Sequence, residues 1–61
     1  KYGDAKNEWK KLRGYWYWFD ANGYAVTGAW KIDGKPYYFL TKFDADRLGV
    51  PECAGFEVSK G

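Results

Sequence analysis

The 61-residue sequence has no histidine, no methionine and a single cysteine, Cys53. One cysteine cannot form an internal disulfide, and without histidine a zinc site would lack its usual ligands. The missing histidine also removes the Ser-His-Asp and Cys-His catalytic arrangements and the commonest general base. We therefore predict that the chain is not an enzyme and has no catalytic residue, no metal site and no cofactor.

The net charge is also small, and the sequence has no long apolar run. The net charge of +2 is too small for a strongly basic nucleic-acid binder, so we expect no nucleic-acid partner. The mean hydropathy of −0.69 and the lack of a long apolar run exclude insertion of a helix into a membrane. The chain starts at Lys1 and shows no signal-peptide apolar region, so we interpret it as a processed or cut piece.

Aromatic residues are abundant, at 23% of the chain, with four Trp, six Tyr and four Phe. Leu, Ile and Val are few by comparison, so the rings must provide most of the packing in a core that is thin at this chain length. Aromatic rings also make good contact surfaces for sugars and cations.

An internal repeat of about 20 residues runs through the first two thirds of the sequence. Trp9, Gly14, Tyr17 and Phe19 recur as Trp30, Gly34, Tyr37 and Phe39. We divide the chain into a lead-in or linker (1–7), a first hairpin repeat (8–28), a second (29–49), degenerate after Leu40, and a C-terminal tail or partial edge strand (50–61).

Each repeat has the pattern of a β-hairpin. Strands are predicted at 9–12, 15–19, 24–27, 30–32 and 36–40, separated by the turn sequences Arg13-Gly14, 20–23 and Asp33-Gly34. The predicted fold is all-β: an antiparallel meander of stacked hairpins forming a short solenoid, with 55–58 as a last edge strand. Asp4 could instead cap a short N-terminal helix, and this alternative stays open.

Successive side chains along a β-strand point to opposite faces of the sheet, so each aromatic ring can be assigned to one of the two faces. We expect Tyr17, Phe19, Tyr37 and Phe39 on one face as the core between hairpins. The other face is expected to leave open the rings of Trp16, Trp18 and Tyr38.

The runs Gly14-Tyr-Trp-Tyr-Trp-Phe-Asp-Ala-Asn-Gly-Tyr-Ala-Val-Thr-Gly28 and Trp30-Lys-Ile-Asp-Gly-Lys-Pro-Tyr-Tyr-Phe39 resemble the repeats of bacterial cell-wall-binding modules. These are the choline-binding repeats of pneumococcal-type surface proteins and phage lysins, with relatives in glucan-binding proteins and clostridial toxins. The resemblance covers about residues 8–40. It implies a β-hairpin solenoid with ligand sites between consecutive repeats.

The resemblance also implies candidate site residues. Trp9 and Trp16 of the first repeat and Tyr38 of the second would form an aromatic cage, and Trp18 and Trp30 would belong to cages with further repeats. A quaternary ammonium group cannot donate hydrogen bonds, so it is held by ring faces.

Departures from the family pattern bear on the ligand. Ala25 stands where choline-binding repeats often have Met, and Pro36 stands where the second Trp is expected. Ala25 and the run Ile32-Asp-Gly-Lys-Pro-Tyr-Tyr-Phe39 are more similar to the toxin and glucan-binding branches, which bind sugars, and this favours a wall polysaccharide over choline. The expected partners are therefore choline or sugar units of a cell-wall polymer, either a teichoic acid or a glucan.

The function that we predict is noncatalytic attachment of a larger protein, such as a lysin or wall hydrolase, to a bacterial surface polysaccharide or teichoic acid. The expected location is extracellular, at the bacterial cell wall. The alternative is a structural solenoid spacer or dimerisation segment whose rings serve only packing, and a homodimer through an open strand edge belongs to that view.

Overall fold

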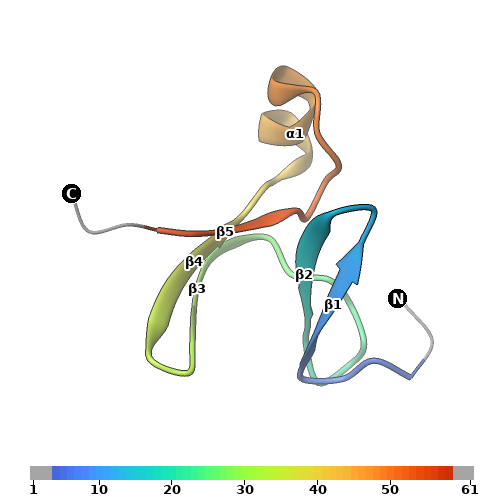
Figure 1. Cartoon of the computed structure of the whole chain (residues 1–61), viewed down its shortest axis with the longest axis vertical. Coiled ribbons are helices and arrows are strands. Elements are labelled where there is room, and N and C mark those ends of the chain that lie inside the picture. Colours follow the sequence, from blue (N-terminus) through green and yellow to red (C-terminus); the bar gives the residue numbers. More distant parts are fainter. Residues whose placement is uncertain (1–3, 59–61) are drawn as a thin grey trace.

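The computed structural model describes residues 4–58, which form five strands and one helix (Figure 1). The elements are β1 (Glu8–Leu12), β2 (Tyr15–Phe19), β3 (Gly28–Ile32), β4 (Lys35–Phe39), α1 (Lys42–Leu48) and β5 (Gly55–Glu57). The strands pair antiparallel in a single sheet of order β1-β2-β5-β4-β3. The prediction of an all-β fold made of antiparallel hairpins is confirmed.

Two tight turns produce the two hairpins. Arg13 and Gly14 have φ values of 54° and 85°, and Asp33 and Gly34 have φ values of 52° and 80°. Positive φ at both central residues is what a two-residue hairpin turn with the right strand twist requires. The predicted turns at these two dipeptides therefore close β1 onto β2 and β3 onto β4.

The segment that follows β2 does not form the strand predicted at 24–27. Asp20 organises the turn, because its Oδ1 accepts hydrogen bonds from the backbone N–H groups of Asn22 and Tyr24 at 2.9 and 3.0 Å. Only Ala25 then pairs with β2, in an isolated bridge to Phe19. Gly28, with a φ of 88°, begins β3 and so the second hairpin.

The last strand, β5, joins the two hairpins. Gly55 pairs with Trp16 of β2 on one side and with Phe39 of β4 on the other. The predicted meander, with 55–58 at an edge, is therefore wrong: β5 is the central strand, and β1 and β3 are the edges. The physical reason is that the short segment at Ala25 pairs with β2 only at Phe19, which leaves Trp16 on the same side of β2 free to pair with Gly55 of β5.

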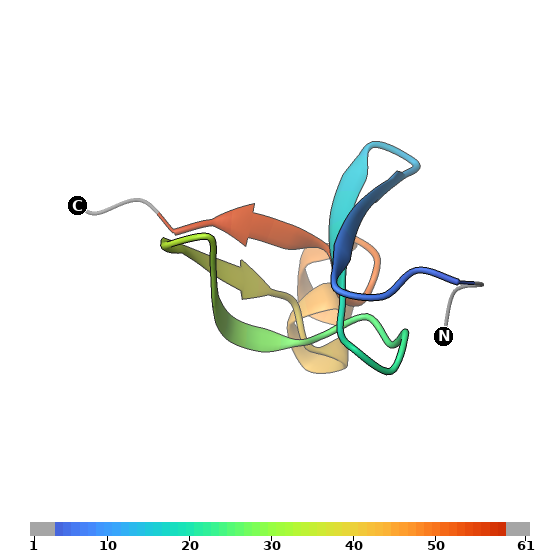
Figure 2. The same ribbon diagram turned by 90° about the horizontal axis from the view of Figure 1, so that it is seen from below.

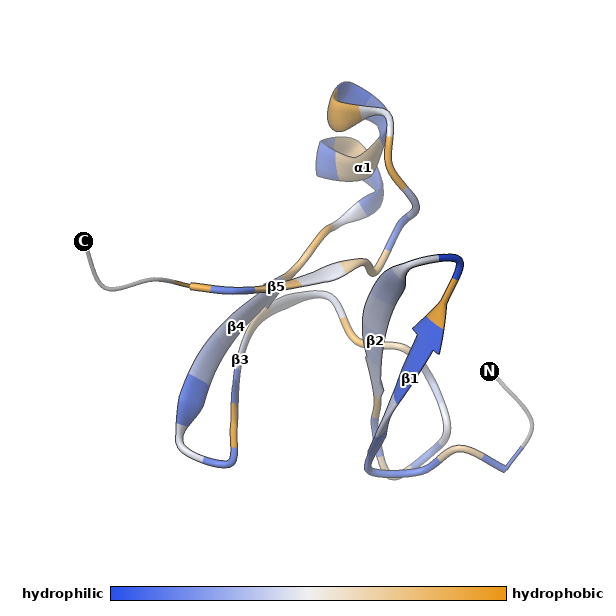
Figure 3. Cartoon of the chain, viewed as in Figure 1, coloured by the Kyte–Doolittle hydropathy of each residue, from blue (hydrophilic) through white to orange (hydrophobic). Residues whose placement is uncertain are grey.

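The hairpins diverge on either side of β5 (Figure 2). Rings of the first hairpin contact rings of the second, since Trp9 packs against Tyr37 and Phe39. One cluster of buried residues comprises Val26, Ile32 and Phe39, with Trp9, Trp18 and Tyr37 packed against it. The ribbon of β2 and β4 is mostly pale to blue in hydropathy (Figure 3), because these two strands consist largely of Trp and Tyr, whose rings are amphipathic.

A second cluster lies between the sheet and α1, a helix that the sequence interpretation did not predict. Leu40, Ala45 and Ala54 are its buried members. Thr41 caps the helix by accepting a hydrogen bond from Asp44 N–H at 3.3 Å, and Gly49 ends it with a φ of 72°.

The alternative of a short helix after Asp4 is wrong, since 8–12 are in β1 and no helix precedes it within the described residues. In the portion from 4 to 58, no helix has the length and apolar character needed to cross a membrane.

Candidate functional site

An open groove of about 470 Å³ lies between the two hairpins, lined by Trp9, Trp16, Tyr37, Gly55 and Glu57. Three different parts of the sheet contribute to it. The two indoles come from the first hairpin, Tyr37 comes from β4, and Gly55 and Glu57 come from β5. The groove therefore exists because β5 holds the hairpins at a fixed distance.

Trp9 is the centre of the aromatic cluster at this groove. Its ring centroid lies 6.2 Å from that of Trp16 with the planes at 89°, and 4.9 Å from that of Tyr37 with the planes at 67°. It also contacts Trp18 at 5.4 Å and Phe39 at 5.8 Å. The edge-to-face contacts hold the rings as the walls of a corner rather than as a flat stack.

Strand register explains why these indoles meet. Trp9 is the cross-strand partner of Trp18, and Trp16 is two residues from Trp18, so the three side chains share one face of the first hairpin. Trp16 remains 48% exposed, whereas Trp9 is half-buried. Much of the Trp16 indole is thus accessible to a ligand.

The hairpins do not stack with equivalent faces together. The face of the first hairpin that carries Trp9 and Trp18 meets the face of the second that carries Tyr37 and Phe39. Phe19 and Phe39 are both buried, as predicted. The expectation that Phe19 and Phe39 share one core face with Tyr17 is wrong. The reason is that β5 lies between the two hairpins, so the second hairpin is not a translated copy of the first.

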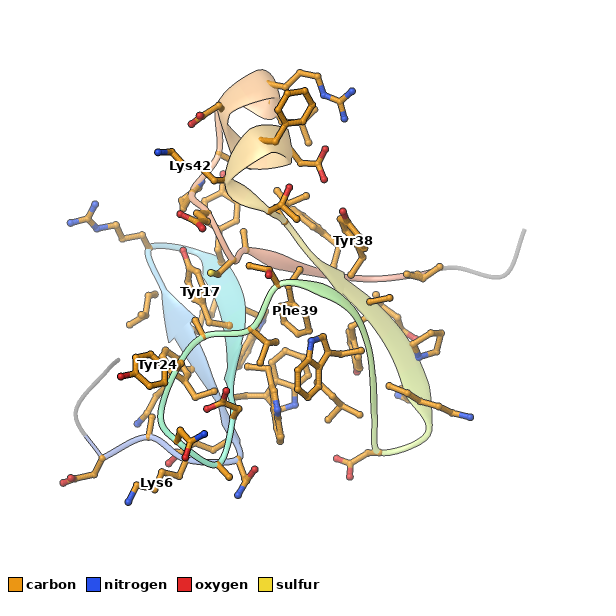
Figure 4. The ribbon with its side chains drawn as sticks, turned by 180° about the vertical axis from the view of Figure 1, so that it is seen from behind. Lys6, Tyr17, Tyr24, Tyr38, Phe39 and Lys42 are labelled. Atoms are coloured by element: carbon orange, nitrogen blue, oxygen red, sulfur yellow. The ribbon has the colours of Figure 1, made fainter. Side chains whose placement is uncertain are left out.

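Tyr38 lies away from the groove, so the expectation that it joins Trp9 and Trp16 is wrong. It packs against the cluster beneath α1, and its hydroxyl donates a 2.7 Å hydrogen bond to Asp44 Oδ2. Figure 4 shows Tyr38 near the helix and Phe39 between the hairpins. The hydrogen bond to the Asp44 carboxylate raises the pKa of the Tyr38 hydroxyl above its ordinary value, with burial adding to the effect.

The two remaining candidates, Trp18 and Trp30, do not line the groove. Trp18 is half-buried and packs against the Val26, Ile32 and Phe39 cluster. Trp30 is 39% exposed, and its Nε1–H donates a 3.1 Å hydrogen bond to the carbonyl oxygen of Thr27. Of the five predicted site residues, only Trp9 and Trp16 therefore line the groove, and Trp18 contacts Trp9 beside it.

Sequence reasoning missed three lining residues, Tyr37, Gly55 and Glu57. Tyr37 was assigned to the core face, and the repeat gives no sign that this face turns toward the indoles of the first hairpin. A signal for Glu57 exists, because alternation places it on the opposite face from Phe56 in a short predicted strand. Its cross-strand partner, Tyr37, follows only from the observed sheet order.

The charges around the groove are opposite in sign on its two sides. Glu57 lines the groove and is exposed. Lys11 Nζ lies 5.9 Å from the ring centroid of Trp16, within the range of a cation–π interaction. Within residues 4–58, no group of three or more His, Cys, Asp or Glu side chains is arranged to hold a metal ion.

An open aromatic groove between antiparallel hairpins is the architecture of a small binding module. Residues 6–45, about two thirds of the chain, match the family model of the choline-binding repeat. The chain belongs to the choline-binding repeat family, whose members are binding modules of the bacterial cell surface. The comparisons with curated proteins and with solved structures gave no match.

Proposed function

We propose that this chain is a noncatalytic module that binds choline groups of a bacterial surface polymer in the groove between its hairpins. A larger protein, such as a lysin or wall hydrolase, would be attached to the cell wall in this way. The observation that carries the proposal is the convergence of Trp9 and Trp16 from one hairpin and Tyr37 from the other on a single open groove.

The chemistry of choline fits such a groove. Its quaternary ammonium group offers no hydrogen-bond donor, so binding depends on ring faces, each contributing about 0.5 to 2 kcal/mol depending on desolvation. Three rings at this strength support a dissociation constant on the order of 1 mM. Several such sites on one protein, acting on a polymer with many choline groups, would raise the effective affinity through multivalency.

The ring geometry favours choline over a sugar unit. A sugar presents a broad apolar face and stacks best on a flat, accessible ring. Here the planes of Trp9 and Trp16 are 89° apart, and those of Trp9 and Tyr37 are 67° apart. Such a corner encloses a compact, nearly spherical group better than a flat one.

A titration of Trp fluorescence with choline tests the proposal, using Trp16→Ala and Trp30→Ala as a matched pair. We expect saturable binding by the natural chain and by Trp30→Ala, since Trp30 does not line the groove. Trp16→Ala should weaken binding about twofold to thirtyfold, the loss expected for one ring. Because Trp16 is 48% exposed, the variant should remain folded.

Two outcomes would reject this function. If the folded natural chain binds a wall glucan but not choline, the ligand of the groove is a sugar and not choline. Unfolding of Trp16→Ala, together with no binding of either ligand by the natural chain, would favour the purely structural alternative.

A further inference from the structure

Glu57 and Tyr37 are direct cross-strand partners in the β4–β5 pair. Partners in register point their side chains to the same face of a sheet, so the Glu57 carboxylate lies on the face that carries the Tyr37 ring. Both residues line the groove together with Trp9 and Trp16. The aromatic groove therefore includes one acidic side chain.

Two other carboxylates of the chain form ion pairs. Asp44 forms an ion pair with Arg47 at 3.1 Å, and Glu8 forms one with Lys10 at 3.7 Å. In the part of the chain from 4 to 58, Glu57 takes part in no ion pair. Its carboxylate is therefore available to a cation that enters the groove.

The position of Glu57 in the sequence separates it from the repeats. The family match ends at residue 45, whereas β5 begins at Gly55. The acidic side chain is thus supplied by the C-terminal segment that joins the hairpins.

We propose that Glu57 is a specificity-determining residue that makes the groove select a cationic quaternary ammonium group over neutral or acidic ligands of the same shape. This inference rests on the proposed function, because it assumes that the groove holds a ligand of this kind. Ring faces alone attract a cation but also accept an uncharged apolar group. A carboxylate in the same groove adds a Coulomb attraction for a positive ligand and repels an acidic one.

Three ligands of similar shape and different charge separate these effects. Choline is the cation, 3,3-dimethylbutan-1-ol is its uncharged carbon analogue, and glycine betaine carries a carboxylate beside the ammonium group. Each is titrated into the full chain at low salt, with ring proton NMR shifts as the readout. The variants are Glu57→Gln and, as a matched control with the same change in charge, Glu52→Gln, which does not line the groove.

We expect Glu57→Gln to weaken choline binding about two- to fivefold, the range of an exposed charge pair. Binding of the uncharged alcohol should stay the same, and binding of betaine, a zwitterion with no net charge, should change less than binding of choline. Glu52→Gln should behave like the natural chain with all three ligands. Added salt should weaken choline binding in the natural chain and have a smaller effect in Glu57→Gln.

Equal choline-to-alcohol affinity ratios in the natural chain and in Glu57→Gln would overturn the role of Glu57 while leaving the groove as a choline site. The same change in ratio in Glu52→Gln would also overturn it, because the effect would then come from overall charge. If the folded natural chain binds none of the three ligands, the proposed function fails and this inference fails with it.

Discussion

The rings of Trp9 and Tyr37 belong to different hairpins, yet their centroids lie only 4.9 Å apart with the planes at 67°. This contact is made across the groove, and it depends on β5, which pairs with both β2 and β4. Packing between the hairpins and formation of the candidate site are therefore the same structural event.

The identity of the tyrosine at the groove gives a first prediction. Tyr37→Ala should weaken choline binding about twofold to thirtyfold, because one ring of the site is lost. Tyr38→Leu, which removes a ring from the helix side, should leave the affinity of the folded chain unchanged. Ring proton NMR titrations measure both. A loss of affinity in Tyr38→Leu alone would contradict the assignment.

The backbone at Gly55 gives a second prediction. A Cβ atom added there would overlap the Phe39 ring, whose Cδ1 would lie only 2.6 Å from it. Phe39 is fully buried, so it cannot move aside freely. Gly55→Ala should lower the free energy of unfolding by about 1 to 3 kcal/mol, as overpacking does, and should also weaken choline binding.

Urea denaturation and a choline titration check this prediction, with Gly28→Ala as the control. Gly28 has a φ of 88° but open space around its Cα, so its variant should lose stability through backbone strain alone. Its choline affinity when folded should remain that of the natural chain. Unchanged stability and affinity in Gly55→Ala would contradict the central role of β5.

Much of the fold could be predicted from the sequence because its hairpin turns are encoded locally. Asp33-Gly34 and the alternating rings of 15–19 determine a turn and a strand without reference to the rest of the chain. The helix could also have been found, since Thr41, Asp44 and Gly49 form the cap pattern of a short helix.

Only the part of the site that lies within a single hairpin could be predicted from the sequence. Trp9 and Trp16 lie in one hairpin, and strand alternation is enough to bring them together. Whether Tyr37 or Tyr38 faces them depends on the rotation of one hairpin relative to the other. That rotation is set by β5, a three-residue strand far along the chain whose pairing no local pattern reveals.

The Tyr38 hydroxyl gives a third prediction, on alkaline pH. Its pKa is raised in the folded chain, mainly by the hydrogen bond to Asp44, so the unfolded chain loses this proton first. The stabilisation is complete below the unfolded pKa of about 10 and is lost as pH rises through the folded value. Tyr38→Phe should be less stable at neutral pH and should lose less stability above pH 10.

Thermal unfolding across the alkaline range measures the effect. Some alkaline loss should remain in Tyr38→Phe, since burial also raises the pKa of Tyr17. An identical pH dependence in the natural chain and the variant would show that the Tyr38 hydrogen bond adds nothing.

The thiol of Cys53 gives a fourth prediction. The side chain is half-buried, and its Sγ lies 3.9 Å from the carbonyl oxygen of Ala25. Burial raises the pKa of the thiol, with the nearby Glu52 charge adding to the effect. Because the thiolate is the reactive form, the native chain at pH 8 should react with a disulfide reagent more slowly than the urea-unfolded chain. Equal reaction rates in the native and the unfolded chain would contradict the burial of the Cys53 thiol and the rise in its pKa.

The most direct test of the account is an NMR measurement of contacts between bound choline and the protein rings. Intermolecular NOEs from the choline N-methyl protons should reach the ring protons of Trp9, Trp16 and Tyr37, and not those of Tyr38. NOEs to Tyr38 or Trp30 instead, or none from choline at saturating concentration, would contradict the claim that the groove between the hairpins is the binding site.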